Sequence, residues 1–393
     1  MVRKLRKEFE EIYFSTVSTT KGLEELAKNI EISKNSLRRF LGKLNDDTQL
    51  RSSTLSLIAQ RLGYKNYGHF CETVGREKYS LDFDLLDIYY GSVKGHGTSH
   101  NETRFQLANY YFAEKIISDP QNLKEFVKRF AQNNEALEYV LAWHPSYENI
   151  AHTNYQAALL QMAHNSPKAH LKVFAYSFIM FGKFMSENLR LEEAKKLMSK
   201  IEKAVKQMRE ESENFHAFPE ARYAIAKIIY THITGTDAQS KRPNAELQRQ
   251  IALRHLPEVT LTDKIIFGTY VTNILNILQD YENADLCFGE FASEKCLKHF
   301  AEDAPHFRAH IFLYKLNWAV TQYHLGNIEK ALTIFKTLPS DLNNMRTFSF
   351  NSKIYFELKY VYFARILYPR RKDLQRRFDI LIARTKFTYM KKI

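Results

Sequence analysis

Apolar residues recur three and four positions apart along most of this 393-residue chain, without lasting strand-like alternation. That spacing gathers them on one face of an α-helix. Turn-forming residues are scarce, at 13 glycines and 9 prolines, whereas β-rich proteins use more of both in their turns. The sequence therefore predicts an all-α protein and nearly excludes a β-barrel.

The N-terminal segment predicts four or five short helices that are joined by polar residues. Hydroxyl side chains open three of them: Thr20, Ser33, and either Ser53 or Thr54 can cap free backbone N–H groups. Gly63 stands where a helix would end in a left-handed residue.

Within that segment, LEELAKNIEISKNSLRRFLGKL has the layout of a helix-turn-helix. Six apolar residues face inward: Leu23, Leu26 and Ala27 on the first helix, and Leu37, Phe40 and Leu41 on the second. The residues left for the outer face of the second helix are Ser33, Lys34, Asn35, Ser36, Arg38, Arg39 and Lys43. Arginine bridges guanine edges, asparagine bridges adenine edges, lysine neutralises phosphate, and serine near a helix start donates to phosphate. These residues predict double-stranded DNA as a partner. The alternative is a small helical bundle that serves docking or dimerisation.

The stretch from Leu23 to Phe70 contains Ser-Leu-Arg-Arg-Phe-Leu-Gly, Ser-Thr-Leu, Leu-Gly-Tyr-Lys-Asn-Tyr and His-Phe. It resembles the small helix-turn-helix domains at the front of many Bacteroidetes-type regulatory proteins. In that pattern the turn usually carries glycine, and Glu31 occupies this place here. A non-glycine residue bears a modest strain if the backbone turns left-handed, and an acidic one weakens phosphate contact.

Three regions follow from the pattern: a helix-turn-helix module at 1–80, a linker at 81–100 and a helical segment at 101–393. Three glycines in GSVKGHGTSHN favour the linker. A phosphate-cradling loop would need Lys-Ser or Lys-Thr after its glycines, and that arrangement is missing here.

Three places in the helical segment share the same pattern of a helix, a turn and a second helix. In each of them a small residue follows the turn, and these residues are Ala194, Ala284 and Ala331. The last, at Trp318–Pro339, resembles a tetratricopeptide repeat, with its Gly-Asn turn and its alanine and phenylalanine in order. The other two have Leu189 and Gln279 in place of the turn glycine, and the gaps are not multiples of about 34 residues. The expected architecture is a degenerate tetratricopeptide-like α-solenoid.

Aromatic residues are abundant, at 23 tyrosines and 28 phenylalanines, and many lie in the repeat segment. Helix packing is the default use for them. The alternative is a concave groove for an extended peptide or a partner helix, in which polar side chains hold the backbone. The candidates for that role are Asn273, Asn276, Arg308 and Asn317.

The net charge of +13 attracts polyanions. Residues 1–80 hold 15 basic and 10 acidic residues, and residues 351–393 hold 12 basic and 3 acidic residues. The surplus therefore sits at the two ends. It is typical either of phosphate contact or of solvated helical faces.

Catalytic patterns are poor, so no enzyme activity, catalytic residue, metal or cofactor is predicted. Two cysteines and three histidines cluster in sequence: Cys287, Cys296, His299, His306 and His310. Their spacing matches no zinc knuckle, and no general-base glutamate lies between the last two histidines. Packing and surface positions are the expected roles for this group.

The longest apolar run, Val173–Phe181, is too short for a membrane span, and residues 1–10 lack an apolar signal core. Three cysteines, an odd and sparse set, suit a reducing compartment, so a cytoplasmic protein is expected.

The predicted function is a DNA-binding transcriptional regulator whose repeat domain senses a peptide or protein, or dimerises. A homodimer is favoured because one short helix reads few bases. The alternative is a non-enzymatic protein–protein interaction scaffold with no DNA role. A hydrolase or nuclease would need a metal or nucleophile constellation, and the sequence offers none.

Overall fold

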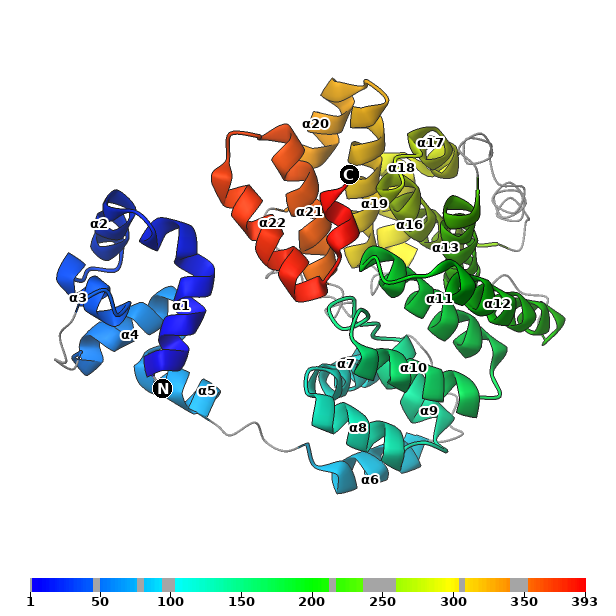
Figure 1. Ribbon diagram of the computed structural model, residues 1–393, viewed down its shortest axis with the longest axis horizontal. Coiled ribbons are helices and arrows are strands. Elements are labelled where there is room, and N and C mark those ends of the chain that lie inside the picture. Colours follow the sequence, from blue (N-terminus) through cyan, green and yellow to red (C-terminus); the bar gives the residue numbers. More distant parts are fainter. Residues whose placement is uncertain are drawn as a thin grey trace. The chain divides into compact units, whose positions relative to one another are not determined.

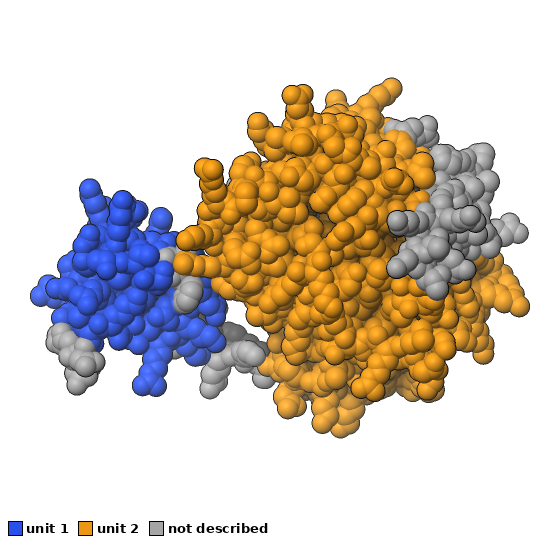
Figure 2. Space-filling model, turned by 45° about the horizontal axis from the view of Figure 1, so that its top comes forward, with its two compact units in different colours: residues 1–82 blue, residues 83–393 orange. Residues whose placement is uncertain are grey.

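The computed structural model describes residues 2–44, 50–75, 81–93, 103–211, 217–235, 259–303, 308–339 and 353–393. Every regular element within these ranges is helical (Figure 1), which confirms the all-α class. The chain divides into two compact units, residues 1–82 and 83–393, which Figure 2 colours blue and orange.

Unit 1 contains five described helices: α1 Val2–Val17, α2 Thr20–Asn29, α3 Lys34–Phe40, α4 Ser52–Arg61 and α5 Tyr67–Gly75. Ser33 caps α3 as predicted, by accepting a hydrogen bond from the backbone N–H of Ser36 at 3.0 Å. The cap of α2 is Thr19, one residue before the expected Thr20. Helix α4 begins at Ser52, and its N-cap residue makes no side-chain capping bond. Gly63 has a φ of 92°, so the predicted left-handed helix end is confirmed.

The core of unit 1 joins α1 to the helices that follow it. Leu5 and Phe9 of α1 are fully buried, and the Phe9 ring meets the Phe40 ring edge-on at 5.4 Å. The Tyr64 hydroxyl donates to Glu8 Oε1 at 2.8 Å, and burial together with this bond raises the pKa of Tyr64 to about 12. Full burial of each large apolar side chain contributes roughly 1.5–3 kcal/mol, so this small core is the main support of α3.

The predicted linker at 81–100 is partly wrong. Residues 83–93 form α6, Phe83–Val93, and belong to unit 2. Leu86 and Tyr90 are buried, and the Tyr90 hydroxyl donates to Asn109 Oδ1 of the next helix at 3.0 Å. The glycine cluster obscured this helix, since two of its three glycines come after α6 ends. Residues 94–100 lie outside the described residues.

Unit 2 begins with α6 and continues through helices that follow one another along the chain. They are α7 Thr103–Ile117, α8 Pro120–Arg129, α9 Asn134–Leu137, a π-helical turn Glu138–Ala142, α10 Thr153–Asn165, α11 Ala169–Met185, α12 Leu191–Glu211, α13 Ala217–Thr234, α16 Leu261–Ile277, α17 Tyr281–Phe288, a 3₁₀ turn Gly289–Phe291, α18 Glu294–Asp303, α19 Arg308–His324, α20 Ile328–Lys336, α21 Lys353–Leu367, α22 Lys372–Thr385 and a 3₁₀ turn Thr388–Lys391. None of the helices in the described ranges combines the length and the apolar character that crossing a membrane requires.

Three helical hairpins of unit 2 share one turn geometry: α11–α12, α16–α17 and α19–α20. Each turn has a left-handed residue, with φ of 57° at Glu187, 60° at Gln279 and 88° at Gly326. In the first hairpin this residue is therefore Glu187 and not Leu189, because the connection is two residues longer than in the others. The small residues after the turns are fully buried, as expected for helices that approach closely: Ala194, Ala284 and Ala331.

Helices α11, α13, α16 and α19 pack each against the next, and α12, α17 and α20 pack on them as a second layer (Figure 1). The C-terminal part of the chain then returns to the beginning of this row. Tyr355 of α21 stacks on Tyr147 at 4.4 Å, and Arg384 of α22 is ion-paired with Glu148 at 2.9 Å. The Tyr355 ring also meets the Phe181 ring of α11 edge-on at 6.1 Å, so the C-terminal helices contact the first helix of this row.

Candidate nucleic-acid interface

Helices α2 and α3 of unit 1 are joined by a short turn at residues 30–33. All six residues expected to face inward are buried: Leu23, Leu26, Ala27, Leu37, Phe40 and Leu41. The turn is closed by two backbone hydrogen bonds, from Glu31 N to Lys28 O at 3.1 Å and from Ile32 N to Ala27 O at 3.0 Å. This is the pairing that ends a helix in a left-handed residue.

Glu31 is that left-handed residue, with a φ of 61°. The glycine position of the turn is thus occupied by a residue with a Cβ, and the expected backbone strain is present. Its side chain is exposed, so an acidic group lies close to the start of α3.

Replacing Glu31 by glycine is expected to stabilise unit 1 by about 0.5–1 kcal/mol, because relief of left-handed strain outweighs the entropy that glycine adds to the unfolded chain. The matched control is Glu25→Gly within α2, which should destabilise unit 1 by about 1 kcal/mol. Hydrogen exchange of the unit 1 amides measures both changes. Equal destabilisation by the two substitutions would show that the turn is unstrained.

Helix α3 is fixed by contacts with α1. The Arg6 Nε group donates to the carbonyl oxygen of Phe40 at 2.5 Å, and the Phe40 side chain is fully buried. Gly42, with a φ of 67°, ends the helix, and the backbone N–H of Lys43 donates to Arg38 O at 2.9 Å. The outward residues of α3 therefore sit on a supported backbone.

None of the seven predicted DNA-binding residues is buried. Ser33, Asn35 and Lys43 are exposed, and Lys34, Ser36, Arg38 and Arg39 are half-buried. Lys34 is ion-paired with Glu24 of α2, and the Lys43 ammonium donates to the backbone oxygen of Val17. Ser33 and Ser36 share a side-chain hydrogen bond of 2.8 Å. Asn35, Arg38 and Arg39 are the members of this set whose side chains can read base edges in a DNA groove.

Comparison of the chain with protein-family models, with curated protein sequences and with solved structures gave no match.

The predicted partner-binding asparagines do not line a groove. Asn273, Asn276 and Asn317 are 3%, 2% and 0% exposed. Asn273 Nδ2 donates to the Tyr355 hydroxyl at 2.5 Å, and Asn276 Nδ2 donates to Asn317 O at 2.9 Å. This part of the prediction is corrected, because α16, α19 and α21 pack on one another and enclose these amides. Arg308 begins α19, and its side chain lies outside the described residues.

The clustered cysteines and histidines occupy separate environments. Cys287 is buried, and the buried His310 ring is hydrogen-bonded through Nε2 to the Tyr270 hydroxyl at 3.0 Å. His306 lies outside the described residues. In the described part of the chain, no group of three or more potential metal ligands comes together.

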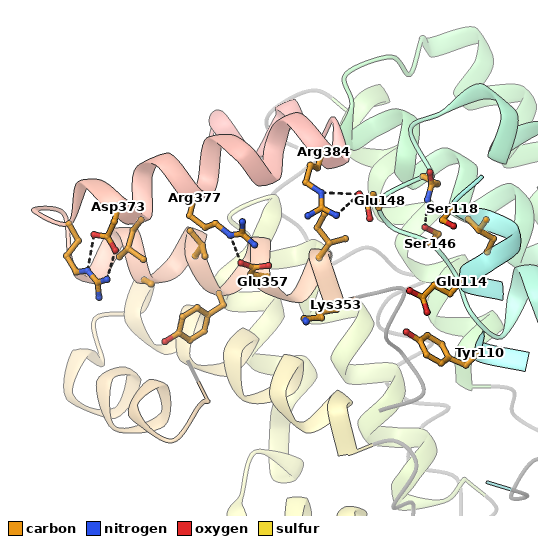
Figure 3. A pocket seen from close by; sticks show the side chains of 18 of the residues that line it. Tyr110, Glu114, Ser118, Ser146, Glu148, Lys353, Glu357, Asp373, Arg377 and Arg384 are labelled. Carbon is orange, nitrogen blue, oxygen red and sulfur yellow. Dashed lines mark hydrogen bonds and ion pairs between the residues drawn. The ribbon is translucent and has the colours of Figure 1, made fainter. Parts of the chain in front are cut away.

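Sequence reasoning missed a hollow in unit 2, which Figure 3 shows from close by. Its volume is about 750 Å³, and its walls come from α7, the loop after the π-helical turn, α21 and α22. The sequence feature that pointed to this region was the surplus of basic residues in 351–393. It did not identify the hollow, because the sequence does not show which carboxylates face the arginines of α22.

Proposed function

We propose that this chain is a DNA-binding transcriptional regulator in which α3 contacts duplex DNA and unit 2 binds a partner. The observation that carries the proposal is the outward set Asn35, Arg38 and Arg39 on a short helix whose opposite face is buried. The B-DNA major groove is about 12 Å wide and admits an α-helix. Arginine and asparagine are the side chains that read guanine and adenine edges there.

Helix α3 has seven residues and is about 10 Å long at 1.5 Å per residue. It reaches only a few base pairs, so the proposed regulator acts as a homodimer on two half-sites. Transcriptional control and a cytoplasmic location belong to this proposal.

The second candidate is a protein–protein interaction scaffold. The contacts of Lys34 and Lys43 favour this function, since each ammonium group already has a partner within unit 1. Those pairings reduce the charge that α3 offers to phosphates, and a helical bundle of this size also suits docking.

A salt titration of duplex binding tests the proposal. A duplex selected from a random 30-base-pair library should bind the full chain, and the affinity should fall about 40-fold between 50 and 200 mM salt if three phosphates are neutralised. Electrophoretic mobility shift measures this change. Failure to select any duplex at 50 mM salt would exclude DNA recognition and leave the scaffold.

A further inference from the structure

The hollow in unit 2 is a groove whose charged groups are arranged as ion pairs along α22 (Figure 3). Arg371 pairs with Asp373, Arg377 Nε lies 2.5 Å from Glu357 Oε1, and Arg384 Nη2 lies 2.9 Å from Glu148 Oε1. These contacts use the Nε and Nη2 groups. Within the described ranges, the Nη1 groups of Arg371, Arg377 and Arg384 make no hydrogen bond to a carboxylate, and these side chains are 60%, 37% and 51% exposed. The carboxylates thus orient the guanidinium groups while donors remain for a ligand.

The charge of the groove favours a ligand without large net charge. Lys353 and Glu114 add one charge of each sign to the three ion pairs, so the lining as a whole is balanced. Carboxylates on the walls would repel a polyanion such as single-stranded nucleic acid. An oriented, neutralised arginine is instead a hydrogen-bond donor for a neutral acceptor such as a peptide carbonyl oxygen.

The apolar part of the lining comes from both sides. Tyr110 of α7 faces the groove from one wall, and Tyr360 and Tyr368 come from α21 and its C-terminal end, together with the side chains of Ile354 and Leu374. Aromatic rings supply large contact areas to apolar side chains. The volume of about 750 Å³ lies within the usual range of ligand sites, about 300–1,000 Å³.

The spacing of the arginines suits an extended chain. From Arg371 to Arg384 the helix rises about 20 Å at 1.5 Å per residue. An extended peptide covers that length with about six residues at roughly 3.3 Å each. Its carbonyl groups and N–H groups alternate, which matches a lining that offers guanidinium donors and carboxylate acceptors by turns.

We propose that this groove binds an extended peptide of about six residues with apolar, uncharged side chains, held through its main chain by the ion-paired arginines. The inference rests on the proposed function in one respect, that unit 2 is the partner-binding unit. It assigns that role to the walls of the α7–α21–α22 groove and not to the enclosed asparagines.

The test begins with selection of the full chain against a phage-displayed library of random 12-residue peptides, without DNA. The enriched peptide, labelled with fluorescein, is then titrated by fluorescence anisotropy at 50 and 500 mM NaCl. We expect peptides rich in aromatic and aliphatic residues, with an affinity that changes less than threefold between the two salts. Arg377→Ala and Tyr360→Ala should each weaken binding at least tenfold, whereas Arg376→Ala, on the same helix but outside the groove lining, should leave it unchanged.

Removal of Arg377 leaves Glu357 without its partner, so Arg384→Gln, at a more exposed position, provides the second variant and should also weaken binding. Absence of any enriched peptide, or equal binding by the groove variants and Arg376→Ala, would overturn the proposal. Displacement of the peptide by oligo(dT) with steep salt dependence would assign the groove to polyanions instead. An α3 variant that lacks Arg38 and Arg39 should bind the peptide normally, so failure of the DNA proposal and failure of this one are separable.

Discussion

Alanine at both Arg38 and Arg39 is expected to weaken the binding of the selected duplex by about 2–6 kcal/mol, which is roughly 30-fold or more. Each arginine that bridges a guanine edge contributes about 1–3 kcal/mol of discrimination. Both residues lie in the second half of α3, half-buried on a helix whose core residues Leu37 and Phe40 stay in place. Fluorescence anisotropy with the labelled duplex measures the loss, and circular dichroism verifies that the variant is folded.

The matched control is the double variant Arg370→Ala and Lys372→Ala, which also removes two positive charges, but from exposed positions in unit 2. This variant should change the affinity for the duplex only slightly, since the electrostatic field of charges outside the binding site is screened over about 10 Å at 0.1 M salt. If the two double variants weaken binding equally, net charge and not α3 is responsible. If the α3 variant binds like the unaltered chain, the scaffold function is the better explanation.

Local features of unit 1 were predictable because they depend on neighbours in sequence. The three- and four-residue spacing identified the buried faces of α2 and α3, and the hydroxyl of Ser33 identified the start of α3. Gly63 and Glu31 were placed correctly in left-handed turns, since the geometry of a helix end is fixed within a few residues. The start of α4 was displaced because three consecutive hydroxyl residues follow Arg51, and the N-cap is Arg51 itself, which makes no side-chain capping bond.

Features of unit 2 that depend on distant residues were not predictable in the same way. Periodicity shows that a side chain faces inward, but it does not show which helix covers it. Asn273 is hydrogen-bonded to Tyr355, which lies 82 positions later in the sequence, and Arg384 is paired with Glu148, which lies 236 positions earlier. The groove-lining interpretation of the asparagines was wrong for this reason. The basic C-terminal helix was recognised, whereas the carboxylates that face it were not.

Lys359 illustrates the same difficulty and has a large consequence for stability. In the sequence it belongs to the basic surplus, but in α21 it is 0% exposed. Its ammonium has no hydrogen-bond partner among the described residues, and it lies over the Tyr362 ring at 5.8 Å from the ring centroid. Burial lowers the pKa of Lys359 from its usual 10.5 to about 7. The folded protein thus carries an uncompensated amine in its interior.

Replacing Lys359 by methionine is expected to raise the free energy of unfolding of unit 2 by about 4 kcal/mol near pH 7. The unfolded chain holds a proton on this amine up to about pH 10, whereas the folded chain releases it above about pH 7. The free energy of unfolding of the unaltered protein should therefore rise as the pH increases from 7 to 10. Below pH 7 the destabilisation caused by the buried lysine should be at its full size. Methionine has a similar length and no charge, so it removes both the penalty and this pH dependence. Urea denaturation at pH 7 and pH 9.5 measures the two effects.

The control is Lys372→Met, at an exposed position of α22, for which we expect a change within about 0.5 kcal/mol at both pH values. The comparison between the two variants removes the contribution of tyrosines and cysteines that titrate over the same range, since both proteins retain them. If Lys359→Met destabilises unit 2 at both pH values, the ammonium must make a favourable interaction in the folded protein. The buried amine would then be a structural contact and not an uncompensated charge, and α21 would depend on it for its position beside the groove.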